Sequence, residues 1–173
     1  ERYPDDFWIA HELGRHLLMA SDAADAAGFL RSAVARLPES PSAHNLLGGV
    51  FVANGQTVEA EREFRETLRL EPNYAPAHQN LAFVLQDQEK WDDAEAALHR
   101  AIELRPGDAI AHANLANLFH VLGKNVECET ALREALRLAP DDWLVNDNVQ
   151  NVVRLHGWAV RMEPEIRQAL DSA

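Results

Sequence analysis

The sequence predicts an all-α solenoid, a stack of similar antiparallel helix pairs. Three observations predict it: prolines recur every 34 residues, apolar residues keep the same spacing, and helix-capping residues mark one point of each interval. The periodic prolines are Pro4, Pro38, Pro72, Pro106 and Pro140. A period in this range indicates a supersecondary unit that packs only on its neighbours.

We number positions within each repeat from Phe7, Pro41, Ala75, Ala109 and Trp143, the five residues at which a helix is predicted to start. The predicted segments are a tail of a preceding repeat or a linker, four repeats, and a degenerate fifth repeat with a C-terminal capping helix. Their bounds are 1–6, 7–40, 41–74, 75–108, 109–142 and 143–173. Since Pro4 falls at the closing position of a repeat, we expect the chain to be cut from a longer protein.

The residue before each first position favours a helix start in four of five repeats. These residues are Asp6, Ser40, Asp108 and Asp142, with Tyr74 as the exception. An Asp or Ser side chain accepts a hydrogen bond from a backbone N–H that the helix leaves unpaired. Pro41 at a first helical position costs nothing there, because its missing N–H would have no partner.

The first helix of each repeat has apolar residues four positions apart, which predicts a buried stripe. The pairs are Leu13 and Leu17, Leu47 and Phe51, Leu81 and Leu85, Leu115 and Phe119, and Val149 and Val153. A small residue beside the stripe predicts close approach of a second helix: Gly14, Gly48, Ala82 or Ala116. Gly55, Gly123 and Gly157 suit a left-handed helix end, whereas Ser21 and Glu89 depart from this rule.

The second helix repeats the alternation of small and large apolar residues. Its close-approach residues are Ala26, Ala60, Ala94 and Cys128, and the larger residues four positions later are Leu30, Phe64, Leu98 and Leu132. The periodic proline then ends the helix, because it cannot continue the backbone ladder. Each repeat is therefore predicted to be one antiparallel helix pair.

These features resemble the tetratricopeptide repeat over nearly the whole chain, most closely in the second to fourth repeats. The fifth repeat departs from the pattern at Met162, Glu163 and Pro164, so we expect residues 159–171 to form an atypical closing helix. The resemblance implies a right-handed superhelix whose first helices line a concave surface. It also implies a binding module for proteins or peptides, held in the concave groove.

Asn80, Asn114 and Asn148 lie one period apart at concave positions. An Asn amide can both donate to and accept from a peptide backbone. These residues are similar to the asparagine ladder in the repeats of O-linked N-acetylglucosamine transferase. Two interpretations stay open: peptide contact, or capping and bridging of helices within the solenoid.

Other concave positions complete the predicted peptide site. They are His11, Arg15, Asn45, Gln79, Phe83, Asn117 and Asn151. Asn45 is one residue away from the ladder position. The carboxylate clamp known from chaperone-binding members needs Lys and Arg on consecutive repeats, and this sequence has Ser42 and Pro76 at such places, so we reject it.

His44, His78 and His112 form another periodic set. One histidine per repeat leaves the rings too far apart to share a metal ion, so we expect them to pack between helices. Cys128 replaces a small buried residue and is expected to be inert. We predict no metal site and no cofactor.

The net charge of −12 argues against nucleic-acid binding, and no apolar run approaches the length of a membrane span. A single cysteine excludes an internal disulfide and favours a reducing, cytoplasmic location. The sequence contains no phosphate loop, nucleophile elbow or metal motif, so we predict a non-enzymatic module that binds a protein or peptide.

Two rival hypotheses remain. The chain is a substrate-recognition arm of a larger enzyme, such as a glycosyltransferase or a protein kinase, or it is a scaffold that associates with itself. The stretch RYPDDFWIAHELG has some similarity to repeat tails of large bacterial kinases.

Overall fold

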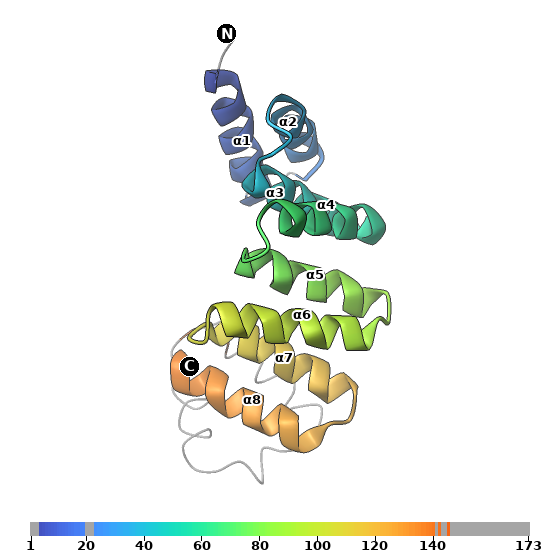
Figure 1. Cartoon of the computed structure of the whole chain (residues 1–173), viewed down its shortest axis with the longest axis vertical. Helices are drawn as coiled ribbons and strands as arrows, with labels where there is room; N and C mark the ends of the chain where they lie inside the picture. The colour runs from blue at the N-terminus through green and yellow to red at the C-terminus, as the bar shows by residue number, and fades with distance from the viewer. Residues whose placement is uncertain (1–3, 20–22, 141, 143–144, 146–173) are drawn as a thin grey trace. The chain divides into compact units, whose positions relative to one another are not determined.

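The computed structural model describes residues 4–19, 23–140, 142 and 145. Figure 1 shows the helices in order along the chain. They are α1 (Pro4–Met19), α2 (Ala23–Arg36), α3 (Pro41–Ala53), α4 (Thr57–Leu70), α5 (Ala75–Asp87), α6 (Trp91–Leu104), α7 (Ala109–Val121) and α8 (Asn125–Leu138). The described residues form no strand, so the all-α prediction is confirmed.

The chain divides into two compact units, residues 1–90 and residues 91–173, called unit 1 and unit 2 below. Helices α1 to α5 belong to unit 1, and α6 to α8 belong to unit 2. The division falls between the two helices of the third predicted repeat.

The helix bounds follow the sequence period. Helices α3, α5 and α7 begin at the predicted first positions, and α4, α6 and α8 begin at Thr57, Trp91 and Asn125, which are again 34 residues apart. Helix α1 differs, since it begins at Pro4 rather than at Phe7, and Asp6 therefore lies inside the helix instead of capping it. A proline is tolerated in a first helical turn, because its missing N–H would have no partner there.

Three predicted caps are confirmed. The Ser40 side chain accepts from the Ala43 N–H. Asp108 Oδ1 accepts from the N–H groups of Ile110 and Ala111, and Asp142 Oδ1 accepts from the Val145 N–H. Each cap pairs backbone groups that would otherwise be left without a partner at the helix start.

The first helices of three repeats end in the same left-handed turn. Gly55, Glu89 and Gly123 have φ values of 70°, 58° and 71°. The N–H of the residue after each one donates to a carbonyl five residues back, the pattern of a Schellman motif. Glu89 therefore adopts a conformation that glycine adopts at lower cost.

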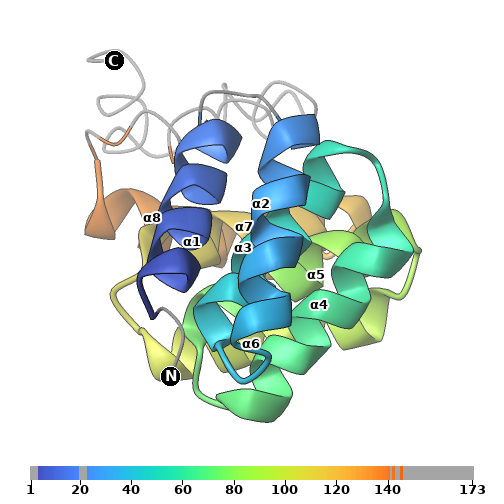
Figure 2. The same ribbon diagram turned by 90° about the horizontal axis from the view of Figure 1, so that it is seen from above.

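Close approach between paired helices is confirmed in unit 1. Helix α1 packs on α2 and α3 packs on α4, and Figure 2 shows α1 and α2 side by side. A Cβ atom built on Gly14 would lie 2.5 Å from the Leu30 side chain, and one on Gly48 would lie 2.5 Å from the Phe64 ring. Both glycines are thus required by the side chain that faces them.

The predicted core residues of the second helices are fully buried: Leu30, Phe64, Leu98 and Leu132. One prediction for the first helices is wrong, because Leu13 is 43% exposed. In the inner repeats a preceding second helix covers this position, as α2 does on α3 and α4 on α5. Within the described part of unit 1, α1 has no such covering helix.

A periodic ion pair joins neighbouring repeats within each unit. Lys90 Nζ lies 3.1 Å from Glu61 Oε2 in unit 1, and Lys124 Nζ lies 2.6 Å from Glu95 Oε2 in unit 2. Both pairs connect the turn before a second helix to the preceding second helix. The contact therefore repeats with the sequence period.

Candidate functional site

The first helices of unit 1 form one continuous face, because α1 contacts α3 and α3 contacts α5. We call this surface the first-helix face; the sequence places most predicted site residues on it. On α5, the most exposed large apolar side chain is Phe83, which is 52% exposed. Asn80 lies three residues before Phe83, so both occupy the same side of the helix.

Two predicted residues of this face bond to each other. Asn80 Nδ2 donates to Asn45 Oδ1 over 3.1 Å, which links α5 to α3. Asn45 is one residue away from the repeat position of Asn80, yet the structure brings the two amides together. For Asn80, the bridging interpretation is thus observed directly. The bond uses one of the two N–H groups that an amide offers.

His11 contributes to packing more than to an exposed surface. The ring is only 6% exposed, and its Nε2 lies 2.9 Å from Ser42 Oγ, which joins α1 to α3. Arg15 donates to Glu12 through Nε at 3.1 Å, and this contact lowers the pKa of Glu12 and raises that of Arg15. Arg15 therefore brings little net charge to the first-helix face.

The remaining predicted residues are distributed over both units. Gln79 is half-buried on α5 of unit 1, whereas Asn114 and Asn117 are half-buried on α7 of unit 2. Asn148 and Asn151 lie outside the described residues. Helix α7 also has an exposed apolar residue in its last turn, Val121, at 60%.

The periodic histidines bond the periodic prolines. The Nε2 atoms of His44, His78 and His112 lie 2.9, 3.0 and 3.1 Å from the carbonyl oxygens of Pro38, Pro72 and Pro106. A carbonyl oxygen can only accept, so each Nε2 carries the proton. The packing prediction is confirmed for His44, which is buried, whereas His78 and His112 are half-buried. In all three repeats the ring joins the start of the repeat to the turn before it.

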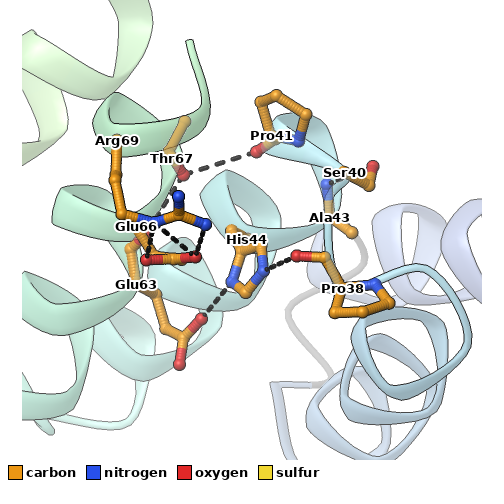
Figure 3. A network of polar contacts seen from close by, with 9 residues as sticks. All are labelled: Pro38, Ser40, Pro41, Ala43, His44, Glu63, Glu66, Thr67 and Arg69. Carbon is orange, nitrogen blue, oxygen red and sulfur yellow. Dashed lines mark hydrogen bonds and ion pairs between the residues drawn. The ribbon is translucent and has the colours of Figure 1, made fainter. Parts of the chain in front are cut away.

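His44 has a second partner (Figure 3). Its Nδ1 lies 2.6 Å from Glu63 Oε2, and the two side chains are 8% and 16% exposed. Both ring nitrogens thus face acceptors, and the hydrogen bond to Glu63 raises the pKa of His44 above its usual value. Sequence reasoning missed this pair, although Glu63 at a position held by alanine in repeats 3 and 4 was a readable signal.

The same network has one further contact between α3 and α4. Thr67 Oγ1 lies 3.3 Å from the carbonyl oxygen of Pro41 on α3 and 3.0 Å from that of Glu63 on its own helix, and Arg69 bonds Glu66 within α4 (Figure 3). The contacts of His44 and Thr67 join the two helices, whereas the Arg69–Glu66 pair stays within one. The network is therefore structural.

The described residues contain no cluster of three or more side chains that could hold a metal ion. Cys128 is fully buried and donates to the Ala116 carbonyl over 3.2 Å. Burial raises the pKa of its thiol to about 11, which disfavours the reactive thiolate. Among the described helices, none combines the length and apolar character needed to cross a membrane.

Unit 2 has a groove that sequence reasoning did not predict. It lies between α6 and α8 over α7 and has a volume of about 870 Å³. Ile102, Leu115 and Phe119 form apolar parts of its wall, and Val126 stands at its edge with 75% exposure. Val58 of unit 1 holds the same repeat position as Val126 and is 70% exposed. The recurrence of valine at this position was a signal in the sequence for an exposed apolar residue.

Comparison with solved structures shows the same fold. PilF of Pseudomonas aeruginosa is 22% identical with a TM-score of 0.80, covering 96% of this chain and 74% of that one. TTC0263, a thermophilic tetratricopeptide-repeat protein of Thermus thermophilus, is 24% identical with a TM-score of 0.78, covering 87% and 83%. A chain of the APC/C hetero-tetramer Cut9–Hcn1 is 23% identical with a TM-score of 0.75, and the match covers 85% of this chain and 30% of that one.

No curated protein sequence matches the chain. A family model does match, over residues 10–139, and describes the middle TPR-like domain of cilia and flagella-associated protein 70. This match spans α2 to α8 in full and most of α1. The chain therefore belongs to the family of that tetratricopeptide-repeat-like domain.

Proposed function

We propose that the chain is a non-enzymatic protein-interaction module that binds an extended partner segment on the first-helix face of unit 1. The tetratricopeptide-repeat fold is in general a fold of protein–protein interaction modules, and the Cut9–Hcn1 neighbour is itself part of a hetero-tetramer. The proposal adds a surface and residues to this general role.

The observation that supports this surface is the exposure of Phe83 beside the Asn45–Asn80 amide pair. A half-exposed phenylalanine can anchor an apolar side chain of a partner, since aromatic residues dominate interface energetics. The neighbouring amides can bond a peptide backbone without reading its side chains. In unit 2, α7 has Asn114 at the repeat position of Asn80 and Asn117 at that of Phe83.

The bond between Asn45 and Asn80 has a function in this proposal beyond bridging. It fixes the rotamer of both amides, so their remaining polar groups present one orientation to a ligand. Fixing an orientation before binding reduces the entropy lost on association. The bridging and peptide-contact interpretations of Asn80 are thus compatible.

Selection from a random peptide library displayed on phage tests the proposal. Peptides that bind the wild-type chain are synthesised and titrated against variants by fluorescence anisotropy. We expect Phe83→Ala to weaken them about tenfold or more and Asn80→Ala to weaken them less, in line with hot-spot behaviour.

Val58→Ala is the matched control, because Val58 is 70% exposed in unit 1 but lies on the second helix α4. The proposal predicts unchanged affinity for this variant. Peptides that bind Phe83→Ala and Asn80→Ala as tightly as the wild type would contradict it.

A further inference from the structure

The groove of unit 2 has a histidine at one end of its floor and a phenylalanine at the other. His112, Leu115 and Phe119 line it from α7, and a helix rises about 1.5 Å per residue, so the two ends are about 10 Å apart. Ile102 of α6 and Val126 of α8 add apolar wall. The lining comes from residues 95–137, so the groove does not depend on where the sequence begins.

The histidine at this end keeps one ring nitrogen for a further partner. His112 Nε2 lies 3.1 Å from the carbonyl oxygen of Pro106, so the proton is on Nε2 and Nδ1 is an acceptor in the neutral ring. Among the residues that the structure describes, no group bonds Nδ1 of this ring. The groove therefore contains a polar atom that a ligand can pair.

Repeat 2 shows which group completes such a histidine. His44 makes the same bond to its proline, and its Nδ1 lies 2.6 Å from Glu63 Oε2. In repeat 4 the residue at the position of Glu63 is Ala131, and Thr130 stands at the position of the longer Arg62. Both Ala131 and Thr130 line the groove. The groove thus lies on the side from which repeat 2 supplies its carboxylate.

The charged groups around this position are the same in both repeats. Two ion pairs between successive turns of the second helix recur at equal positions. They are Arg65–Glu61 and Arg69–Glu66 in repeat 2, and Arg133–Glu129 and Arg137–Glu134 in repeat 4. A further carboxylate of the groove, Glu95, is paired with Lys124 at the Phe119 end. Because repeat 2 accommodates a carboxylate among these groups, the same groups permit one in repeat 4.

We propose that the groove of unit 2 binds a small apolar carboxylate. The carboxylate bonds His112 Nδ1, and the apolar body lies along Leu115 and Phe119. The ring takes up a proton on binding, because an imidazolium donates through both nitrogens. An aliphatic chain of about eight carbons matches the length of about 10 Å between the two ends.

The size of the groove suits such a ligand. Its volume of about 870 Å³ lies within the range of small-molecule sites, which combine apolar walls with a few placed polar groups. The site is separate from the first-helix face of unit 1. Either proposal can therefore fail alone.

Sodium octanoate is the probe. Titration into the isotope-labelled chain, followed by NMR, is expected to show saturable shifts of the His112 ring signals. The dissociation constant should be on the order of 1 mM, as for a ligand of about ten non-hydrogen atoms. Butyrate lacks most of the apolar body and octanol lacks the charge, so each should bind about tenfold more weakly or worse.

Two variants locate the site. Ala131→Glu supplies from α8 the carboxylate that repeat 2 has, so it should compete with octanoate and weaken its binding about tenfold or more. His112→Ala removes the ring nitrogen and should have the same effect. Asn125→Asp is the matched control, because it adds one negative charge at an exposed position of α8 outside the groove lining. Circular dichroism compares the folding of all three variants.

Three results would each overturn the inference. The first is an octanoate titration that does not saturate or leaves the His112 signals unmoved. The second is equal affinity for octanoate in the wild type, Ala131→Glu and His112→Ala. The third is octanol binding as tightly as octanoate, since the groove would then recognise apolar surface without a carboxylate.

Discussion

Repeat 2 and repeat 4 share one backbone pattern but pack it differently. In repeat 2, Gly48 faces the large ring of Phe64, whereas repeat 4 has Ala116 and Leu132 at these positions. All four residues are buried. A smaller residue on one helix is thus matched by a larger one on its partner, so that the interhelical space stays filled.

The two repeats also differ in polar content. His44 of repeat 2 bonds both Pro38 and Glu63, whereas His112 of repeat 4 has the proline contact and Ala131 at the position of Glu63. The shared period therefore specifies the backbone contact of the histidine. The residue on the second helix decides whether that histidine also has a carboxylate partner.

The largest expected effect comes from the glycine of repeat 2. Gly48→Ala places a Cβ atom 2.5 Å from the Phe64 ring, so we expect a loss of about 2–3 kcal/mol in the free energy of unfolding. Urea denaturation followed by circular dichroism measures it. Adding Phe64→Leu, the combination of repeat 4, should recover part of the loss.

Gly28→Ala is the matched control for this prediction. A Cβ atom at Gly28 meets nothing within 4 Å, so the helical propensity of alanine should raise stability by about 0.5–1 kcal/mol. A Gly48→Ala variant that is equally stabilised would show that the close approach has no energetic cost.

The second effect concerns the polar contact of repeat 2. Glu63→Ala removes the carboxylate that faces the buried ring of His44, and we expect a loss of about 1–2 kcal/mol near pH 6. The pKa of His44 is raised in the folded state, so the pair contributes fully below the unfolded value of about 6.5 and its contribution is lost as pH rises through the folded pKa. The difference between wild type and variant should therefore shrink at high pH.

Histidine titration by NMR gives an independent reading of the same pair. The apparent pKa of His44 should fall in Glu63→Ala. An unchanged titration of His44 in this variant would show that Glu63 does not set the charge of the ring.

A smaller and opposite effect is expected in repeat 3. Glu89 has φ of 58°, where repeats 2 and 4 have Gly55 and Gly123. Glu89→Gly should stabilise the chain by about 0.5–1 kcal/mol, since the left-handed strain exceeds the entropy that glycine adds to the unfolded state. Thermal unfolding would show a higher midpoint, and a lower one would contradict the strain argument.

The smallest effect is predicted for the ion pair between repeats. Lys124→Met removes the contact with Glu95 but keeps apolar area beside the Phe119 ring, from which the Lys124 amine is 5.3 Å away. We expect a slight loss of stability at low salt that disappears at high ionic strength, because salt screens exposed charges. The comparison uses unfolding midpoints at the two salt concentrations.

Much of the fold was predictable because one period fixes several features together. The starts of α3, α5 and α7, three of the caps and the buried second-helix residues all follow from the spacing and the capping chemistry. The start of α1 could not be predicted in this way, since Pro4 is compatible both with ending one helix and with beginning another. The exposure of Leu13 depends on a neighbour that a repeat pattern assumes for every repeat.

The candidate site was less predictable, because its contacts cross between repeats at unequal positions. Asn80 bonds Asn45, which the strict period places one residue out of line. The His44–Glu63 pair needs two residues on different helices. The histidine recurs with the period, but the glutamate does not. A repeat pattern describes what recurs, whereas these contacts depend on single substitutions.

The proline–histidine bonds described above have a consequence for how the chain acquires its structure. Pro38 and His44 are six residues apart, and the Asn45–Asn80 bond spans 35 residues. Contacts of such short range require little loop closure, so low contact order predicts rapid folding. A repeat can then nucleate on its own ordered turn and propagate to its neighbour, and under force the chain would open one helix pair at a time.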